Sequence, residues 1–365
     1  MRKLNVGLGK NSYDIIIGEN YTENFSEYIK KVYSGNNLFV ITDSNVHEIY
    51  KNKYDEMFGY FKYTVYVLKA GEKNKHIGVM QGIYSAMIKA GIKRNDMIAA
   101  FGGGVTGDIA GFAAASYLRG IDFIQIPTTI VSQVDSSVGG KVGVDLPEGK
   151  NLVGAFYQPR LVLIDSSFLN TLTDRYFYDG FAEIVKYGCI CDKALFRQLT
   201  DIVKNTVENG KKHIGKYKEI LRKELMKNIT DLIYKSCEIK KKIVEKDEKE
   251  SGLRMILNFG HTIGHAIEQY TDYEKYSHGE AISTGMTHMV KIGEKKGITE
   301  KGCSEKLEYL LRGLNLPTDI EYSRNEIAEI MKRDKKSVDD GINFVFLKEI
   351  GNAEIIKMKE KEIFE

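Results

Sequence analysis

Residues 101–120 read FGGGVTGDIAGFAAASYLRG, and this segment indicates the architecture of the first half of the chain. It follows an apolar run at Met97–Phe101, and its Gly102, Gly104 and Gly107 have the spacing G-x-G-x-x-G before an alanine-rich helical segment. A glycine turn between a strand and a helix leaves backbone N–H groups at the positive end of the helix, where a diphosphate can bind. Tight packing of the strand against the helix is the other explanation for these glycines. We interpret the segment as part of a nucleotide site.

Short apolar runs alternate with amphipathic segments through the first 165 residues. We predict strands at Tyr13–Ile17, Leu38–Thr42, Tyr63–Leu68, Met97–Phe101, Phe123–Ile126 and Leu161–Ile164. We predict helices near Tyr21–Val32, Val46–Lys53, Lys75–Ala90 and Gly107–Leu118. Such apolar runs are typical of parallel strands that are buried on both faces. The alternation predicts a Rossmann-like α/β nucleotide-binding domain at residues 1–165, with ligands at the carboxyl ends of its strands, where Asp43 could hold a ribose hydroxyl.

The pattern changes after residue 165, and helical periodicity then dominates almost to the end of the chain. We therefore expect residues 166–365 to form a mainly α-helical domain. One hairpin is predicted at Asn343–Met358, because Gly351 and Asn352 supply a turn between two apolar runs. A length of 365 residues suits two such domains.

The composition excludes several classes of protein. Lysine and arginine number 53 against 50 aspartate and glutamate, and this near balance argues against a nucleic-acid partner. No run approaches the roughly 20 apolar residues of a membrane span. The four cysteines, at positions 189, 191, 237 and 303, form no C-x-x-C pair and fit a reduced cytosol. We expect a cytoplasmic protein with no membrane or nucleic-acid partner.

The segment Leu257–Glu280 concentrates histidine in a chain that has only seven, with His261, His265 and His278 within eighteen positions. On a helix, His261 and His265 leave the same face one turn apart, as in helical zinc sites. His278 follows a turn-like segment and could fold back as a further ligand. Histidines on a surface or in a satisfied core are the alternative. We interpret the segment as a divalent metal and acid–base site.

A glycine-rich polar segment runs from Gln125 to Pro159 and is interpreted as a long functional loop. It contains Asp135, Lys141, Lys150 and Asn151 among its glycines. Lysines beside glycine backbone suit an anionic substrate or a phosphate, although each lysine alone could simply be solvated.

Motifs across the chain resemble those of the 3-dehydroquinate synthase family, in the sugar phosphate cyclase superfamily. They are GGGVTGDIAGFAAASYLRG, PTTIVSQVDSSVGGKVGVDLPEGKN, GAFYQP, GFAEIVKYG, DEKESGLRMILNFGHTIGHAIE, HGEAISTGM and RDKK, in order between about residues 40 and 350. The chain departs from the family at Val142 and Asp145, where Thr or Ala and Asn are usual, and at His76, where a small hydroxyl residue is common.

The resemblance implies a different metal site from the one that spacing favours. Its ligands would be Glu183, His261 and His278, holding Zn²⁺ or Co²⁺, while His265 would lie by the substrate. Residues implied to act in catalysis are Lys141, Lys186, Glu250 and His265. Substrate contacts are implied for Asp135, Asn151, Lys186, Lys240, Arg254, Asn258 and Lys335. NAD contacts are implied for Asp43, Glu72, Lys75, Gly104, Val105, Thr106, Gly107, Asp108, Thr128, Thr129, Lys141, Lys150, Phe168, Leu169, Asn170 and Thr171. Arg119 would reach the substrate phosphate of a neighbouring subunit, which implies a homodimer.

The reaction implied by the resemblance converts the sugar acid phosphate 3-deoxy-D-arabino-heptulosonate 7-phosphate into 3-dehydroquinate and phosphate, in the shikimate pathway of aromatic amino acid biosynthesis. Transient oxidation by NAD acidifies a C–H bond, phosphate is eliminated, the same cofactor returns the hydride, and an intramolecular aldol closes the ring. One alternative is a related cyclase that makes 2-deoxy-scyllo-inosose or epi-valiolone. Lys240, Arg254 and Asn258 favour a carboxylate substrate instead. The other alternative is a metal-dependent polyol dehydrogenase, for which the loops DSSVGGK and GKN have no purpose.

Overall fold

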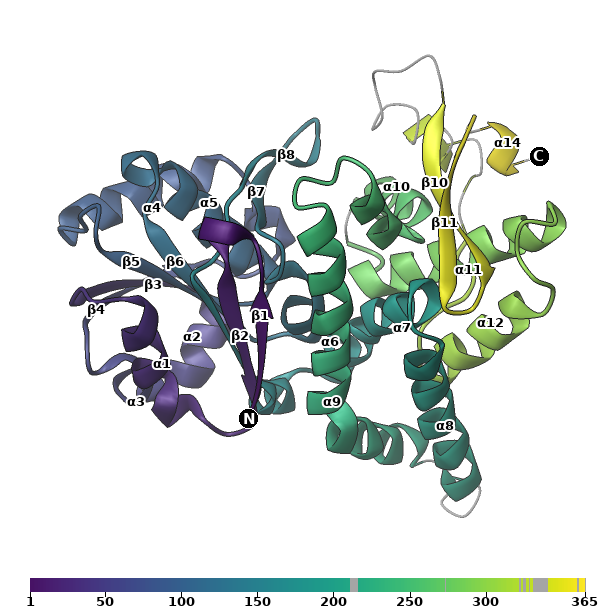
Figure 1. The fold of residues 1–365 in the computed structure, drawn as a ribbon, viewed down its shortest axis with the longest axis horizontal. Coiled ribbons are helices and arrows are strands. Elements are labelled where there is room, and N and C mark those ends of the chain that lie inside the picture. Colours follow the sequence, from purple (N-terminus) through teal and green to yellow (C-terminus); the bar gives the residue numbers. More distant parts are fainter. Residues whose placement is uncertain are drawn as a thin grey trace. The chain divides into compact units, whose positions relative to one another are not determined.

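The computed structural model describes residues 1–210, 216–272, 274–321, 323, 326–327, 329–330, 341–359 and 361–364 (Figure 1). The chain divides into two compact units. The first unit comprises Met1–Leu172 and Lys240–Lys249, and the second unit comprises Thr173–Ile239 and Glu250–Glu365. Among the described residues, no helix is long and apolar enough to cross a membrane.

The first unit is built on a seven-stranded sheet with the strand order β1-β2-β9-β6-β5-β3-β4. Its strands are β1 Arg2–Val6, β2 Tyr13–Gly18, β3 Asn37–Asp43, β4 Lys62–Leu68, β5 Met97–Gly102, β6 Asp122–Pro127 and β9 Leu161–Asp165. Every neighbouring pair is parallel except β1 with β2. The six predicted strands and the mostly parallel sheet are confirmed. The edge strand β1 was not predicted, because only Leu4 and Val6 of its five residues are buried.

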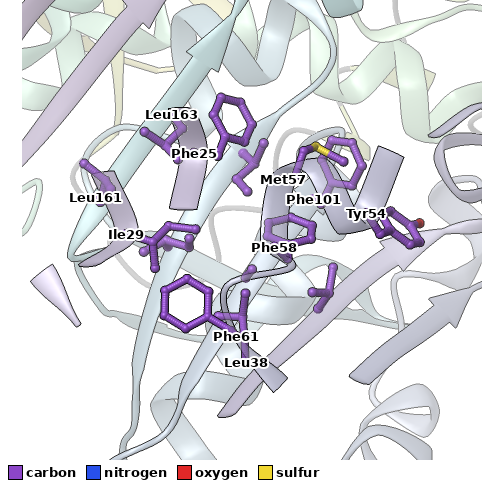
Figure 2. Packing of buried hydrophobic residues seen from close by; sticks show 14 of the residues in the cluster. Phe25, Ile29, Leu38, Tyr54, Met57, Phe58, Phe61, Phe101, Leu161 and Leu163 are labelled. Carbon is purple, nitrogen blue, oxygen red and sulfur yellow. The ribbon is translucent and has the colours of Figure 1, made fainter. Parts of the chain in front are cut away.

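Helices cover both faces of this sheet. They are α1 Phe25–Val32, α2 Ser44–Tyr50, α3 Tyr54–Phe58, α4 Gly78–Lys89 and α5 Gly104–Ser116. Side chains of β5 alternate between two cores: Phe101 packs with Phe25 and Phe58, as Figure 2 shows, whereas Ala100 packs with helices α4 and α5 on the other face. The Rossmann-like layers predicted from the alternating pattern are therefore present.

The segment interpreted as a long loop is instead ordered structure. It contains a π-helical turn at Ser132–Ser136 and an antiparallel hairpin of β7 Lys141–Leu146 and β8 Gly149–Phe156. Gly143 and Gly154 face each other in this hairpin, and a Cβ on Gly143 would lie 2.6 Å from the carbonyl oxygen of Val153. These glycines therefore permit close approach of two strands rather than marking a loop, which is why the interpretation was wrong.

The second unit is mainly helical, as predicted. Its helices are α6 Asp174–Asp179, α7 Phe181–Ile190, α8 Lys193–Gly210, α10 His261–Tyr270, α11 His278–Lys295, α12 Cys303–Gly313 and α14 Lys361–Phe364. Helix α9, Tyr217–Lys246, begins in the second unit, and its last residues belong to the first. The predicted hairpin is confirmed as β10 Ile342–Glu349 paired with β11 Asn352–Met358, and Gly351 in the turn has φ +92°.

Candidate active site

Glu183, His261 and His278 bring three potential metal ligands together in the second unit. Glu183 Oε1 lies 3.2 Å from His278 Nε2 and 3.4 Å from His261 Nε2. One potential ligand atom from each residue lies within 4.8 Å of the other two. A carboxylate with two imidazoles suits Zn²⁺ and similar transition metals, and three protein ligands leave positions open for a substrate. The donor set therefore fits a catalytic divalent cation.

Three helices position these ligands. Every residue of α7 is buried, so the side chain of Glu183 is held away from water. Helix α10 starts at His261 directly after Gly260, whose φ of +78° lies in the left-handed region. A Cβ on Gly260 would also lie 2.8 Å from the backbone nitrogen of Met286 in α11. Glycine at this position therefore allows α10 and α11 to pack closely.

The first turn of α11 is fixed by acidic side chains. Asp179 Oδ1 accepts hydrogen bonds from the backbone N–H groups of Gly279, at 2.6 Å, and Glu280, at 3.2 Å. Ser277 and Glu280 form a capping box around the same turn. A Cβ on Gly279 would lie 2.7 Å from the carbonyl carbon of Asp179. Because His278 is the first residue of this helix, these contacts fix its backbone position.

Glu183 remains ionised although it is fully buried. Burial raises the pKa of its carboxyl, but the charges of Lys186 and His261, with hydrogen bonds from His261 and His278, lower that pKa well below its usual range. Lys186 forms an ion pair with Glu183 Oε2, and its side chain is 1% exposed. A buried carboxylate held in its charged form is suited to binding a cation.

His265 lies beside the three ligands, but it is not grouped with His261 as a ligand. Its ring centroid is 5.2 Å from that of His261 and 6.2 Å from that of His278. Among the described residues, the second possible metal group is His265, Glu268 and His278, and neither group contains both His261 and His265. The structure therefore places His265 next to His261, as helical spacing predicts, but not in one metal group with it.

Other predicted residues of the second unit lie in the segment that leads into α10. Asn258 Nδ2 donates to Glu250 Oε1 at 3.0 Å, and the backbone of Glu250 has φ +57°. Arg254, in the short helix Leu253–Asn258, is 1% exposed. Lys335 lies outside the described residues.

A charged network in the first unit joins five of the predicted residues. Lys75 Nζ donates to Asp108 Oδ2 and to Asn151 Oδ1, at 2.6 Å each, and Lys150 pairs with Glu72 at 3.3 Å. Burial alone would lower the pKa of Lys75, but Asp108 and the nearby carboxylates raise it above its ordinary value, so the ammonium stays charged. The structure thus brings together residues from β8, α5 and the loop after β4.

Two of the three departures from the family pattern support this network. Asp145 Oδ1 accepts from the backbone N–H of Asn151 at 2.7 Å, and the Asp145 N–H donates to the carbonyl of Lys75 at 2.7 Å. His76 forms an isolated β-bridge with Asp145. The third departure, Val142, packs in the core beneath α5.

The start of α5 is the candidate site for a diphosphate. Its preceding residue, Gly103, has no side chain to cap the first turn. Asp43 caps α2 through Oδ1, and its Oδ2 accepts from Thr106 Oγ1 at 3.3 Å. A Cβ on Gly102 would lie 2.6 Å from Thr106 Oγ1, and one on Gly107 would lie 2.7 Å from Gln125 Oε1. Tight packing therefore accounts for Gly102 and Gly107, while the first turn of α5 has no side-chain cap and could bind an anion.

The remaining predicted residues of this unit lie on several different elements. Thr128 is buried, and its N–H donates to the carbonyl of Gly102 at 2.9 Å. A hollow of about 340 Å³ is lined by Phe168, Asn170 and Thr171 together with Tyr50 and Lys53. Lys240 Nζ pairs with Asp135 Oδ1 at 2.9 Å. Lys141 is exposed at the start of β7, and Arg119 has φ +67°.

Sequence reasoning missed two acidic residues next to the ligands, Asp179 and Glu268. Spacing could not identify Glu183 either, since it lies 78 residues before His261. The signal for Glu268 is its position one turn after His265 on the same helix. Asp179 carries no comparable signal, because its partners are backbone groups 100 residues away.

Comparisons with known proteins agree along the whole chain. Residues 65–179 match the family model for the 3-dehydroquinate synthase N-terminal domain, and residues 180–337 match the C-terminal one. A 3-dehydroquinate synthase of Clostridium acetobutylicum is 46% identical over 368 residues, which cover 100% of this chain and 98% of the relative. One from Clostridium perfringens is 47% identical over 361 residues, or 97% of each chain. A structure of 2-deoxy-scyllo-inosose synthase with carbaglucose-6-phosphate, NAD⁺ and Co²⁺ has a TM-score of 0.85 and 25% identity, covering 99% of this chain and 98% of that chain.

Proposed function

The chain belongs to the 3-dehydroquinate synthase family, and from this premise we propose that its residues carry out that family's reaction on 3-deoxy-D-arabino-heptulosonate 7-phosphate. The products are 3-dehydroquinate and phosphate, a step of the shikimate pathway. The observation that carries the proposal is the buried Glu183, one of whose oxygens faces the Nε2 atoms of both His261 and His278. This donor set suits a catalytic cation on which a polyol substrate can be bound.

The metal ion and NAD would be held by different sets of residues. Glu183, His261 and His278 would hold Zn²⁺ or Co²⁺, and the α5 helix end with Asp43, Lys75 and Asp108 would hold NAD. When bound, the metal supplies Lewis acidity and the nicotinamide supplies a reversible hydride acceptor. The related 2-deoxy-scyllo-inosose synthase, complexed with NAD⁺ and Co²⁺, supports the presence of both groups.

Cationic side chains would hold the two anionic ends of the substrate. Arg254 is a buried guanidinium that can donate two parallel hydrogen bonds to a carboxylate. Lys240, Lys141 and Lys335 would bind the remaining anionic oxygens. Fixing both ends of the carbon chain keeps the reacting atoms aligned through several steps.

Four other residues would manage hydroxyl groups and protons. His265 is exposed beside the metal ligands, and imidazole is the side chain best suited to proton transfer near neutral pH. Lys186 holds the charge of Glu183 and can donate to a substrate oxygen. The hydrogen-bonded pair of Glu250 and Asn258 would orient substrate hydroxyls, since the carboxylate accepts and the amide both accepts and donates.

We also propose that the protein is a cytoplasmic homodimer in which Arg119 reaches the phosphate of the neighbouring subunit's substrate. Leu118 and Arg119 both have positive φ, at +50° and +67°. Strained backbone of this kind persists where its surroundings hold it, often at functional sites.

The test is to follow phosphate release and NADH absorbance together, with the purified protein, its substrate, catalytic NAD⁺ and Zn²⁺ or Co²⁺. The proposal expects one phosphate per dehydroquinate, no net NADH, and loss of both products with a chelator. NADH that accumulates with turnover of a polyol would indicate a dehydrogenase. Turnover of a hexose phosphate that lacks the carboxylate, with none of the acid, would indicate a related cyclase.

A further inference from the structure

Glu268 is a buried carboxylate that the proposed chemistry does not use. It lies on α10, is 3% exposed, and its Oε1 is 3.5 Å from His278 Nδ1. The opposite ring nitrogen of His278, Nε2, faces Glu183 at 3.2 Å. The imidazole of His278 is thus placed between two carboxylates, one on each nitrogen.

His261 shows the same arrangement with a different partner. Its Nδ1 lies 3.1 Å from the carbonyl oxygen of Phe259, and its Nε2 faces Glu183. A carbonyl oxygen can only accept a hydrogen bond, so this Nδ1 carries a proton. A neutral imidazole with its proton on Nδ1 presents its lone pair at Nε2, which is the atom that a metal between these residues would need.

His278 needs such an anchor more than His261 does. Its side chain is 31% exposed against 12% for His261, so packing confines its ring less. The backbone of His278 is held by Asp179 and the capping box, but those contacts do not set the rotation of the ring. A contact on Nδ1 does set it, and Glu268 makes that contact.

We propose that Glu268 is a positioning residue that accepts the Nδ1–H of His278 and so keeps Nε2 directed at the metal. The inference rests on the proposed metal site and deepens it. Carboxylates that orient a metal-bound histidine in this way fix its tautomer and increase its basicity. Glu268 touches neither the metal nor the substrate in this role.

One competing use of Glu268 is a second metal site, because His265, Glu268 and His278 also have ligand atoms within 4.8 Å of one another. In that site His278 Nδ1 would bind a metal and could not carry a proton. The two uses predict different numbers of bound metal ions, so a metal count separates them.

The experiment compares Glu268→Ala and Glu268→Gln with the wild-type chain. Co²⁺ and Zn²⁺ affinities are measured by competition with a chromophoric chelator, and the visible spectrum of bound Co²⁺ reports ligand geometry. We expect Glu268→Ala to bind each metal about 10–100-fold more weakly with an altered Co²⁺ spectrum. The amide oxygen of Glu268→Gln can still accept from Nδ1, so this variant should recover most of the affinity.

Glu294→Ala is the matched control. Glu294 lies on α11, as His278 does, and its carboxylate accepts from the N–H and hydroxyl of Ser304 at 2.9 and 2.6 Å. This variant should lower the melting temperature of the metal-free protein while leaving metal affinity within about twofold of wild type, since no metal ligand is touched.

Unchanged metal affinity in Glu268→Ala would overturn the inference, as would two metal ions per wild-type chain. An equal loss of affinity in Glu294→Ala would reduce the role of Glu268 to general stability. The readouts do not depend on turnover. A wild-type chain that binds one metal ion but releases no phosphate would therefore refute the proposed function and leave the Glu268 inference standing.

Discussion

Replacing Gly279 with alanine should displace His278 and weaken metal binding. The added Cβ would lie 2.7 Å from the carbonyl carbon of Asp179, whereas carbon atoms in contact are about 3.5–4.0 Å apart. The start of α11 must therefore move by about 1 Å, or its hydrogen bond to Asp179 must break. A metal site tolerates changes of only about 0.2 Å in its metal–ligand distances. The displacement thus exceeds what the metal site can absorb.

Gly279→Ala should change both the stability of the fold and the affinity for the metal, by amounts that can be estimated separately. Alanine gains at most about 1 kcal/mol of helix propensity, while overpacking costs about 1–3 kcal/mol, so the metal-free variant should melt several degrees lower. Metal affinity should fall by at least the roughly 10–100-fold that removing an outer partner costs. This affinity is measured by competition between the protein and a chelator for Co²⁺ or Zn²⁺.

Gly293→Ala supplies the control on the same helix. Its Cβ would meet the side chains of Thr299, at 3.0 Å from Cβ, and of Phe346, at 3.3 Å from Cδ1, and neither residue is a proposed metal ligand. This variant should lose stability and keep its metal affinity. Wild-type affinity in Gly279→Ala, or an equal loss in Gly293→Ala, would refute the reasoning.

Two further outcomes follow from buried charges. Lys75→Met leaves Asp108 without its ion-pair partner at 2.6 Å, and breaking a buried ion pair costs about 3–5 kcal/mol. The NAD⁺ affinity measured by calorimetry and the melting temperature should therefore both fall. Wild-type values of both would contradict a role of this ion pair in NAD binding and stability. Burial alone would lower the pKa of His278, but Glu268 and Glu183 raise it well above 6.5 in the metal-free chain. Protonated His278 then stabilises the metal-free fold fully below about pH 6.5, and this contribution is lost as pH rises through the raised pKa. As the pH rises over that range, the melting temperature of the metal-free protein should therefore decrease while its metal affinity increases. A rise of both with pH would contradict the protonation of His278 in the metal-free protein.

Most of the sheet was predictable because β2, β3, β5, β6 and β9 are largely buried apolar runs, and burial of this kind leaves little choice of structure. The hairpin of β7 and β8 was not, because Gly143 and Gly154 serve strand contact yet have the composition of a loop. Local pattern cannot distinguish these two uses of glycine.

The candidate site likewise contains residues that the sequence pattern could identify and residues that it could not. His261, His265 and His278 are close in sequence, so their spacing alone predicts a candidate metal site in this segment. The choice among them depends on Glu183, which reaches the site through the packing of α7 rather than through any local repeat. The pair of Lys240 and Asp135 likewise joins residues 105 positions apart. Only the resemblance to a family predicted roles for these residues.

Glu183→Gln keeps the shape of the side chain but removes the negative charge that Lys186, His261 and His278 surround. Metal content per chain and phosphate release from 3-deoxy-D-arabino-heptulosonate 7-phosphate are measured on the same samples of wild type and variant. We predict one metal ion per wild-type chain with turnover, and loss of both in Glu183→Gln. A variant that keeps its metal and its turnover would contradict the account.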